Sequence, residues 1–386
     1  MHLRLQKTGP RVRLPYLRFL TPEGGAGEAS GAAQVSGGHL LTADADVTLR
    51  YATLDVQRLL GLIASLTTPA DSVPTARTEA RTEARAGRRA APGNPSLLAN
   101  DALSAVLRVE ADQVRYGVIR GSRFRLMSRL RDGEARLDNC SFEALQGRVS
   151  LRGRLQSTAT RQHHPAQVQV QLEDVQLPAL FEMATTLGLN VLGGDNIRGT
   201  LRGVADLRTD LDAALLPARA RTAGYLRTDI RDLELLNVEA LMEALKFMKA
   251  ERTGHLYFEP VRSEFLLSDG QLLIPDLRLN SNLSNLAVSG TYGLDGRADL
   301  FIGLKPMQAL FGNNDRRIAR IQSGEPASRS DRKLTYVSLR RAAPTDKYKV
   351  HLFQKDEQRR EQAALRARCR ALLLTQRLDT TVRLLR

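Results

Sequence analysis

Short stretches in which apolar and polar residues strictly alternate recur along most of this sequence. In residues 167–173, QVQVQLE, the valines and the leucine fall on one face of a strand and the glutamines and the glutamate on the other. The same alternation returns at 103–111, 149–155, 277–279 and 298–304. A strand with one apolar face is typical of an antiparallel sheet that is dry on one side only. The sequence therefore predicts a mainly β protein.

Asp-Gly dipeptides separate several of these runs, at 132–133, 269–270 and 295–296. A type I′ turn needs positive φ at both central residues, which Asp and Gly tolerate well. Asp-Gly between alternating runs therefore predicts tight hairpins. Because candidate helices are few, we expect the strands to form a meandering antiparallel sheet.

A first internal repeat joins a strand to a short helix. Residues 54–60 (LDVQRLL), 175–181 (VQLPALF) and 236–242 (LNVEALM) share the order apolar, any, apolar, any, any, apolar, apolar. The spacing of the apolar residues changes from 2 to about 3.6 partway, as it would where a strand passes into a helix. We expect these short helices to cap one end of the sheet.

A second internal repeat is a hairpin. Asp132-Gly133 is followed 20 residues later by Gly153, and Asp269-Gly270 is followed 20 residues later by Gly290. Repetition of a multi-strand unit predicts an elongated, twisted antiparallel sheet in which each unit contacts mainly its neighbours. An ordinary β-sandwich with accidental internal similarity is the alternative, because alternation does not separate open sheets from sandwiches.

One segment has the composition of a linker. Residues 69–96 contain the tandem repeat ARTEARTEAR and no large apolar residue after Val73 until Leu97. Such a segment buries too little surface to offset its ordering entropy. We therefore expect a partial module at 1–68, a disordered linker at 69–96, the main module at 97–312 and a basic tail at 313–386.

The formal charge of +15 is concentrated in that tail. Residues 316–386 contain 19 Lys and Arg against 7 Asp and Glu, whereas the rest of the chain has 38 against 35. We expect a last strand at 347–353 and then a basic helix from Lys355. Such a helix can lie on an anionic membrane surface, and a solvated tail is the alternative. Nucleic-acid binding is not expected, because few aromatic residues interleave with the charges.

No catalytic motif is present, so the sequence predicts neither an enzyme nor a cofactor. It contains no phosphate-binding P-loop, nucleophile elbow, zinc-protease helix or EF-hand loop. Gly193-Gly194 lacks the glycine spacing and the lysine of a phosphate loop and is interpreted as a turn. His163 and His164 have no acidic or cysteine neighbour at ligand spacing, so a solvated turn is favoured over a metal site.

The two cysteines, Cys140 and Cys369, exclude a disulfide scaffold. Cys140 aligns with Leu277 in the hairpin repeat, so we interpret it as a small buried hydrophobic residue. A disulfide between the two would require an oxidising compartment and is the less favoured alternative.

Neither a membrane span nor a signal peptide is predicted. The longest uncharged, apolar-leaning runs, 59–70 and 183–194, are 12 residues each, and a span needs about 18. The first 20 residues carry scattered charge and no apolar core, unlike an export signal.

The segment SEFLLSDGQLLIPDLRLNSN at 263–282, continued by LAVSG at 286–290 and LFIGL at 300–304, resembles the C-terminal region of AsmA-like proteins. Segments 107–117 and 145–155 are similar to the preceding family repeat. The resemblance covers 97–312 well and 34–66 weakly. It depends on the order and spacing of degenerate motifs rather than on any single residue.

The resemblance implies a protein on the periplasmic side of the Gram-negative inner membrane, related to the TamB group and to eukaryotic bridge-like lipid transfer proteins. Members fold as repeating β-grooves with an apolar floor, and the implied role is passage of phospholipid between membranes or support of outer-membrane biogenesis. The sequence lacks the N-terminal anchor usual in the family. We therefore expect either a C-terminal part of a longer protein or localisation by other means.

A sheet that is apolar on one face must hide that face. Here the repeats extend the sheet instead of covering it, and acyl chains could fill the resulting trough, because each buried CH₂ contributes about 0.8 kcal/mol without fixed polar contacts. For each lining residue, ordinary core is an equal alternative. A scaffold that docks an unknown envelope protein through its sheet edges is the competing function. The predicted lining residues are Leu107, Val109, Val149, Leu151, Val168, Val170, Leu172, Leu277, Leu279, Leu286, Val288, Leu300, Ile302 and Leu304.

Overall fold

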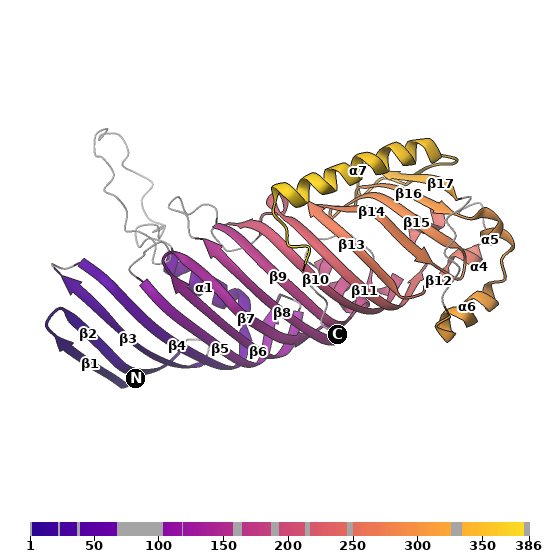
Figure 1. Ribbon diagram of the computed structural model, residues 1–386. Helices are drawn as coiled ribbons and strands as arrows, with labels where there is room; N and C mark the ends of the chain where they lie inside the picture. The colour runs from indigo at the N-terminus through magenta and orange to yellow at the C-terminus, as the bar shows by residue number, and fades with distance from the viewer. Residues whose placement is uncertain are drawn as a thin grey trace, which may run out of the picture.

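The chain forms one long, twisted sheet of 18 strands that does not close on itself (Figure 1). This computed structural model describes residues 2–21, 24–36, 39–67, 103–117, 119–156, 164–186, 193–212, 217–244, 250–325 and 334–381. Strands make up 61% of the protein. The prediction of an elongated antiparallel sheet is confirmed, and the β-sandwich alternative is wrong.

Successive strands are neighbours in the sheet, so its order follows the chain. All pairings are antiparallel except that of β4 with β5, which is parallel. The strands up to α2 are β1 (His2–Thr8), β2 (Arg11–Leu20), β3 (Ala26–Ser36), β4 (His39–Asp55), β5 (Leu103–Tyr116), β6 (Ile119–Arg131), β7 (Glu134–Ala144), β8 (Gly147–Gln156) and β9 (His164–Gln176).

The remaining strands continue the same sheet, with β11 pairing both the short β12 and β13. They are β10 (Ile197–Leu211), β11 (Ala223–Leu236), β12 (His255–Tyr257), β13 (Val261–Ser268), β14 (Gln271–Asn280), β15 (Asn285–Gly293), β16 (Ala298–Leu304), β17 (Thr335–Arg341) and β18 (Lys349–His351). The helices are α1 (Val56–Thr67), α2 (Leu177–Thr186), α3 (Glu239–Ala244), α4 (Ala250–Thr253), α5 (Pro306–Phe311), α6 (Asn314–Ser323) and α7 (Lys355–Thr375).

The strand-to-helix repeat is confirmed at all three places. Strands β4, β9 and β11 lead into α1, α2 and α3. Each antiparallel pairing reverses the strand direction, and an even number of such pairings separates β5, β9, β11 and β16 from one another. Because β4 is also parallel to β5, all five of these strands run in the same direction. The helices that follow them, α1, α2, α3 and α5, therefore lie along the same long edge of the sheet, which we call the helix edge.

The hairpin repeat is confirmed residue by residue. Strands β6–β8 and β13–β15 have the same turn, the same register and the same β-bulge in their second strand. Bulges bend a strand and increase its twist, so each unit adds curvature at an equivalent place. The equivalent pairs are Leu137 with Gly153 and Ile274 with Gly290, and beyond the bulge Cys140 with Leu151 and Leu277 with Val288.

Two of the three Asp-Gly turns have the predicted geometry. Asp132 and Gly133 have φ of 51° and 71°, and Asp269 and Gly270 have φ of 53° and 71°, as a type I′ turn requires. At Asp295-Gly296 only the glycine has positive φ, 90°. That connection is a wider loop, in which the N–H of Gly293 donates to the carbonyl of Arg297 and the N–H of Gly296 donates to the carbonyl of Gly293.

The predicted modules at 1–68 and 97–312 contribute to one continuous sheet, because β4 pairs with β5. The predicted linker, 69–96, lies outside the described residues. Within the tail, 313–386, the expected strand and helix correspond to β18 and α7. The tail also contains α6 and β17, which the sequence analysis did not identify.

Candidate functional site

One apolar row crosses the sheet from β4 to β13, built from residues that lie directly opposite one another on neighbouring strands. We call it the apolar row. Its members come from nine strands and contain no polar side chain other than one thiol, so this face of the sheet is apolar along the row. They are Leu49, Val109, Leu126, Cys140, Leu151, Val170, Ala205, Leu226 and Phe265.

The opposite face of the same strands is polar. On β9, Val168 and Val170 alternate with Gln169 and Gln171, whose side chains point the other way. Ion pairs cross this face between neighbouring strands, such as Arg227 with Glu264 at 3.0 Å. The one-sided apolar pattern predicted from the sequence is therefore present in the structure.

The predicted lining residues share this apolar face but differ in burial. Near the C-terminal end they are almost fully buried: Leu279, Leu286, Leu300, Ile302 and Leu304 have exposed fractions of 8%, 3%, 9%, 2% and 1%. Most of the lining residues on β5, β8 and β9 are less buried. Leu107, Leu151, Val168, Val170 and Leu172 are half-buried, as are Leu277 and Val288, whereas Val109 and Val149 are buried.

Protein covers the apolar face at the C-terminal end. Leu177 of α2, Leu241 of α3 and Ala309 of α5 join the core formed by β10–β17. Helix α3 follows β11 yet contacts β17, so it links two strands that lie far apart in the order of the sheet. Along the apolar row, the residues from β8 to β13 are only partly buried, and Phe265 among them also packs against this core. Most of the predicted lining residues on β14–β16 are buried within the core itself.

Sequence reasoning missed strand β6, which supplies Phe124 and Leu126 to the apolar face. Its sequence, IRGSRFRLMSRLR, places an arginine at nearly every second position and resembles a polar segment. The available signal was the alternation of Phe124, Arg125 and Leu126, which puts the aromatic and the leucine on one side.

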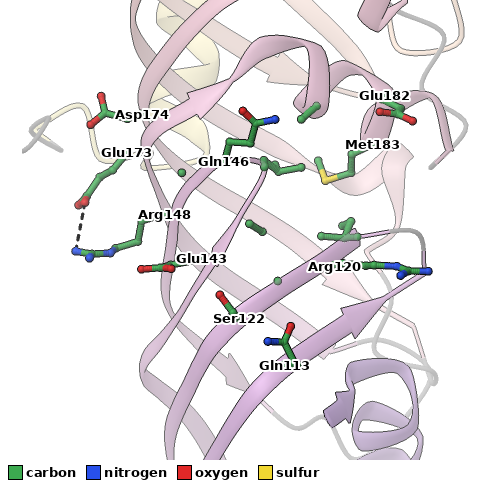
Figure 2. A pocket seen from close by; sticks show the side chains of 16 residues that line it. Gln113, Arg120, Ser122, Glu143, Gln146, Arg148, Glu173, Asp174, Glu182 and Met183 are labelled. Carbon is green, nitrogen blue, oxygen red and sulfur yellow. Dashed lines mark ion pairs between the residues drawn. The ribbon is translucent and has the colours of Figure 1, made fainter. Parts of the chain in front are cut away.

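A pocket of about 1010 Å³ opens at the helix edge, between the turn that joins β7 to β8 and helix α2 (Figure 2). The turn contributes Leu145 and Gln146, which have positive φ of 56° and 59° although neither is glycine. Helix α2 contributes Glu182 and Met183, whose side chains lie across the pocket from the turn (Figure 2). The pocket borders the apolar face through Ala144, which is buried.

The carboxylates around this pocket are mostly held by arginines. Arg148 pairs with Glu173 at 3.7 Å (Figure 2), and Arg202 pairs with Asp174 at 2.7 Å. The hydrogen bonds from Arg202 lower the pKa of Asp174. A general acid or base requires a carboxyl group whose pKa is tuned toward neutrality, so this pocket provides a charged rim rather than an acid–base pair.

Helix α7 covers part of the polar face of β11–β14. Leu365 and Cys369 are buried against an apolar patch on these strands, and Leu372 and Leu373 pack beside them. The apolar side of the basic helix is therefore occupied by the sheet, and only Leu374 of its apolar segment is well exposed. The patch consists of Tyr225, Leu266 and Leu273.

Polar contacts hold α7 and the residues after it on the sheet. Gln362 donates to the carbonyl of Pro275 at 3.0 Å. The backbone N–H of Asp379 donates to a carboxylate oxygen of Asp206 at 2.8 Å, and Asp206 is completely buried. Helix α7 and the residues that follow it up to 381 are thus attached to the sheet by both apolar and polar contacts.

Both cysteines are free and buried, on β7 and α7. Cys140 is one of the residues of the apolar row, as its alignment with Leu277 predicted. Burial raises the pKa of its thiol to about 12 and also raises the pKa of Cys369. Neither thiol has the lowered pKa of a reactive cysteine.

The interpretation of His163 and His164 as a solvated turn is wrong for His164, which begins β9 and is 2% exposed. His163 lies outside the described residues. Gly193-Gly194 does lie at a turn, followed by a short 3₁₀ helix at 194–196. Within the described ranges, no cluster of His, Cys, Asp and Glu could hold a metal ion. No helix among them is long and apolar enough to cross a membrane.

Comparison with known proteins adds no relative: no family model, curated protein or solved structure matches this chain.

Proposed function

We propose that this protein binds phospholipid acyl chains on the apolar face of its sheet and passes them between two membranes, without catalysis. The observation that carries the proposal is the apolar row, which is only partly buried from β8 to β13. Five of its neighbouring members there, Leu151, Val170, Ala205, Leu226 and Phe265, are half-buried and lie directly opposite one another.

A contiguous apolar row that protein covers only in part favours a further apolar occupant, because soluble monomers rarely leave large contiguous apolar patches open to water. Covering it with acyl chains would contribute about 0.8 kcal/mol for each buried CH₂. Aliphatic side chains suit that ligand, since acyl chains form no directional contacts. The row crosses the strands, so a chain lying along it would contact several strands at once.

The proposed setting is the Gram-negative envelope, with the chain on the periplasmic side of the inner membrane and a role in outer-membrane biogenesis. It rests on the resemblance of residues 97–312 to AsmA-like proteins. The repeated hairpin units and the unclosed sheet support that resemblance, because they are the architecture it implies.

Site-specific photo-crosslinking tests the proposal. A photoreactive phenylalanine analogue replaces Val168, on the apolar face of β9, in one variant and Gln169, on the opposite face, in a matched control. The full chain is irradiated after expression in a Gram-negative host, and crosslinked phospholipid is identified by mass spectrometry. We expect lipid adducts at position 168 and not at 169. Equal labelling at both positions, or none at either, would reject acyl-chain binding.

Docking of a protein through the sheet edges is the alternative function. Strands β1 and β18 are the two edges of the unclosed sheet and leave backbone groups unpaired. Edge docking predicts crosslinks from β1 or β18 to protein and no lipid at position 168.

A further inference from the structure

Large apolar side chains are exposed at the C-terminal end of the sheet. Helix α5 presents Met307, Leu310 and Phe311 with exposed fractions of 71%, 39% and 75%. Leu352 and Phe353, between β18 and α7, are 46% and 80% exposed. We call these five residues the apolar tip. Isolated surface hydrophobic residues need no explanation, but a cluster marks a contact site.

The strand pairings place the two parts of the apolar tip at the same edge. Leu304, the last residue of β16, lies opposite Thr335 of β17, and α5 begins two residues later. The backbone N–H of Gln354 donates to the carbonyl of Tyr336 at 3.0 Å. Phe353 and α5 therefore both lie near the start of β17, at the end of the molecule where Figure 1 shows α5 beyond the last strands.

The contacts that attach α5 to the core determine which of its sides is exposed. Ala309, on the inner side of the helix, is completely buried in the core of β10–β17. The guanidinium of Arg252 donates to the carbonyls of Leu310 and Gly312, both at 2.7 Å, and so holds the C-terminal turn of α5. The helix cannot turn its exposed side inward without breaking these contacts and exposing Ala309.

Basic residues surround the apolar tip. Residues 305–320 contain four Lys and Arg against one Asp, and residues 346–360 contain five against three Asp and Glu. Among the residues that the structure describes, Lys305, Arg316, Lys349 and Lys355 have no carboxylate partner, so their charges are available to an outside anion. Apolar side chains within basic surroundings are typical of a surface that enters the headgroup region of an anionic bilayer.

We propose that the apolar tip docks on the surface of an anionic phospholipid bilayer. Met307 and Phe311 enter the boundary between headgroups and acyl chains, and the flanking lysines and arginines approach the lipid phosphates. This attachment does not depend on lipid in the apolar row, and it uses α5 rather than the basic helix α7, whose apolar side is already covered.

Vesicle co-sedimentation of the full, delipidated chain tests the docking. The vesicles are an equimolar mixture of phosphatidylcholine and phosphatidylglycerol, and pure phosphatidylcholine serves for comparison. The variant combines Met307→Ser with Phe311→Ser. The matched control combines Leu20→Ser with Leu41→Ser, which removes two exposed leucines, 80% and 48% exposed, at the opposite end of the sheet.

We expect the tip variant to bind the mixed vesicles about tenfold more weakly or worse, and the control to bind like the unchanged chain. Binding should also weaken on pure phosphatidylcholine. Equal binding of the tip variant would overturn the proposal. So would a chain that ignores vesicles but forms dimers that the tip variant dissociates, because the tip would then contact a second copy. Crosslinking at position 168, on the apolar face beside the apolar row, measures lipid binding separately. Failure of one proposal is therefore distinguishable from failure of the other.

Discussion

A charge placed at Val170 separates an open apolar face from a closed core. Val170 lies on β9 between Leu151 and Ala205 and is half-buried. Full burial of a valine is worth about 1.5–3 kcal/mol, so Val170→Asp forfeits about 1 kcal/mol of apolar burial. On a half-open face the new carboxylate can reach water and stay hydrated. We therefore expect the free energy of unfolding to fall by about 1–2 kcal/mol, while lipid binding is lost.

Replacement of Ile302 by aspartate should instead cause a large loss of stability. Ile302 is 2% exposed and lies between Val288 and Val337 in the closed end of the sheet. A carboxylate there has no access to water, and burying it without a partner costs several kcal/mol. Domains have only about 5–15 kcal/mol of total stability. We expect Ile302→Asp to unfold this end of the protein.

Gln171→Asp is the matched control, because Gln171 is the next residue of β9 and faces the polar side. It removes the hydrogen bond from Gln171 to Glu173 and should therefore lower the free energy of unfolding by no more than about 0.5–1 kcal/mol. The lipid content should not change. Urea unfolding followed by circular dichroism measures stability, and mass spectrometry of an organic extract measures bound phospholipid. The reasoning is refuted if Val170→Asp unfolds the chain as Ile302→Asp does, since the face would then be closed. It is refuted equally if Val170→Asp retains the full lipid load.

Three further outcomes are expected. The thiol of Cys140, with its pKa raised from 9.0 to about 12, should react with a maleimide at pH 8 only as fast as the chain unfolds. Its contribution to the free energy of unfolding should be full below pH 9 and should decline as the pH rises toward 12. Unfolding experiments at alkaline pH would measure this decline. Gln146→Gly relieves a positive φ of 59° and should raise the free energy of unfolding by about 1 kcal/mol, seen as a higher urea midpoint with an unchanged slope. Asp206→Ala removes the acceptor for the backbone N–H of Asp379 and should expose the end of the chain to limited proteolysis, whereas a cleavage pattern like that of the unchanged chain would show that α7 alone holds it.

The parts of the fold that could be predicted depend on local chemistry. Asp132-Gly133 forms a type I′ turn because both residues tolerate positive φ there. The wider loop at Asp295-Gly296 shows that an Asp-Gly dipeptide does not by itself determine a type I′ turn, since Asp295 does not adopt positive φ. Strand β6 escaped prediction because alternating arginines outweigh Phe124 and Leu126 in composition.

Which apolar residues are covered could not be predicted, because cover comes from residues distant in the sequence. Phe142 and Leu279 occupy equivalent places in the two hairpin units, yet Phe142 is half-buried and Leu279 is 8% exposed. Alternation assigns both to the apolar face and says nothing about what lies over it. Leu279 belongs to the core that Leu177 of α2, Leu241 of α3 and Ala309 of α5 join, and no local pattern encodes this packing.

For the proposed function, this unequal cover determines how lipid could move. Two copies of one hairpin unit have the same register, but they meet the partly buried stretch of the apolar row at different strands. The first copy, β6–β8, joins it at its last strand, and the second, β13–β15, at its first. A chain sliding from strand to strand would meet the closed core at β14–β16, where Leu300, Ile302 and Leu304 are at most 9% exposed. Passage through that core would require α3 to leave β17, whereas entry and exit across the open face of β8–β13 require no rearrangement. Lipid exchange through the open face is therefore the simpler route, with the apolar tip bringing the covered end of the sheet to a membrane rather than acting as an outlet.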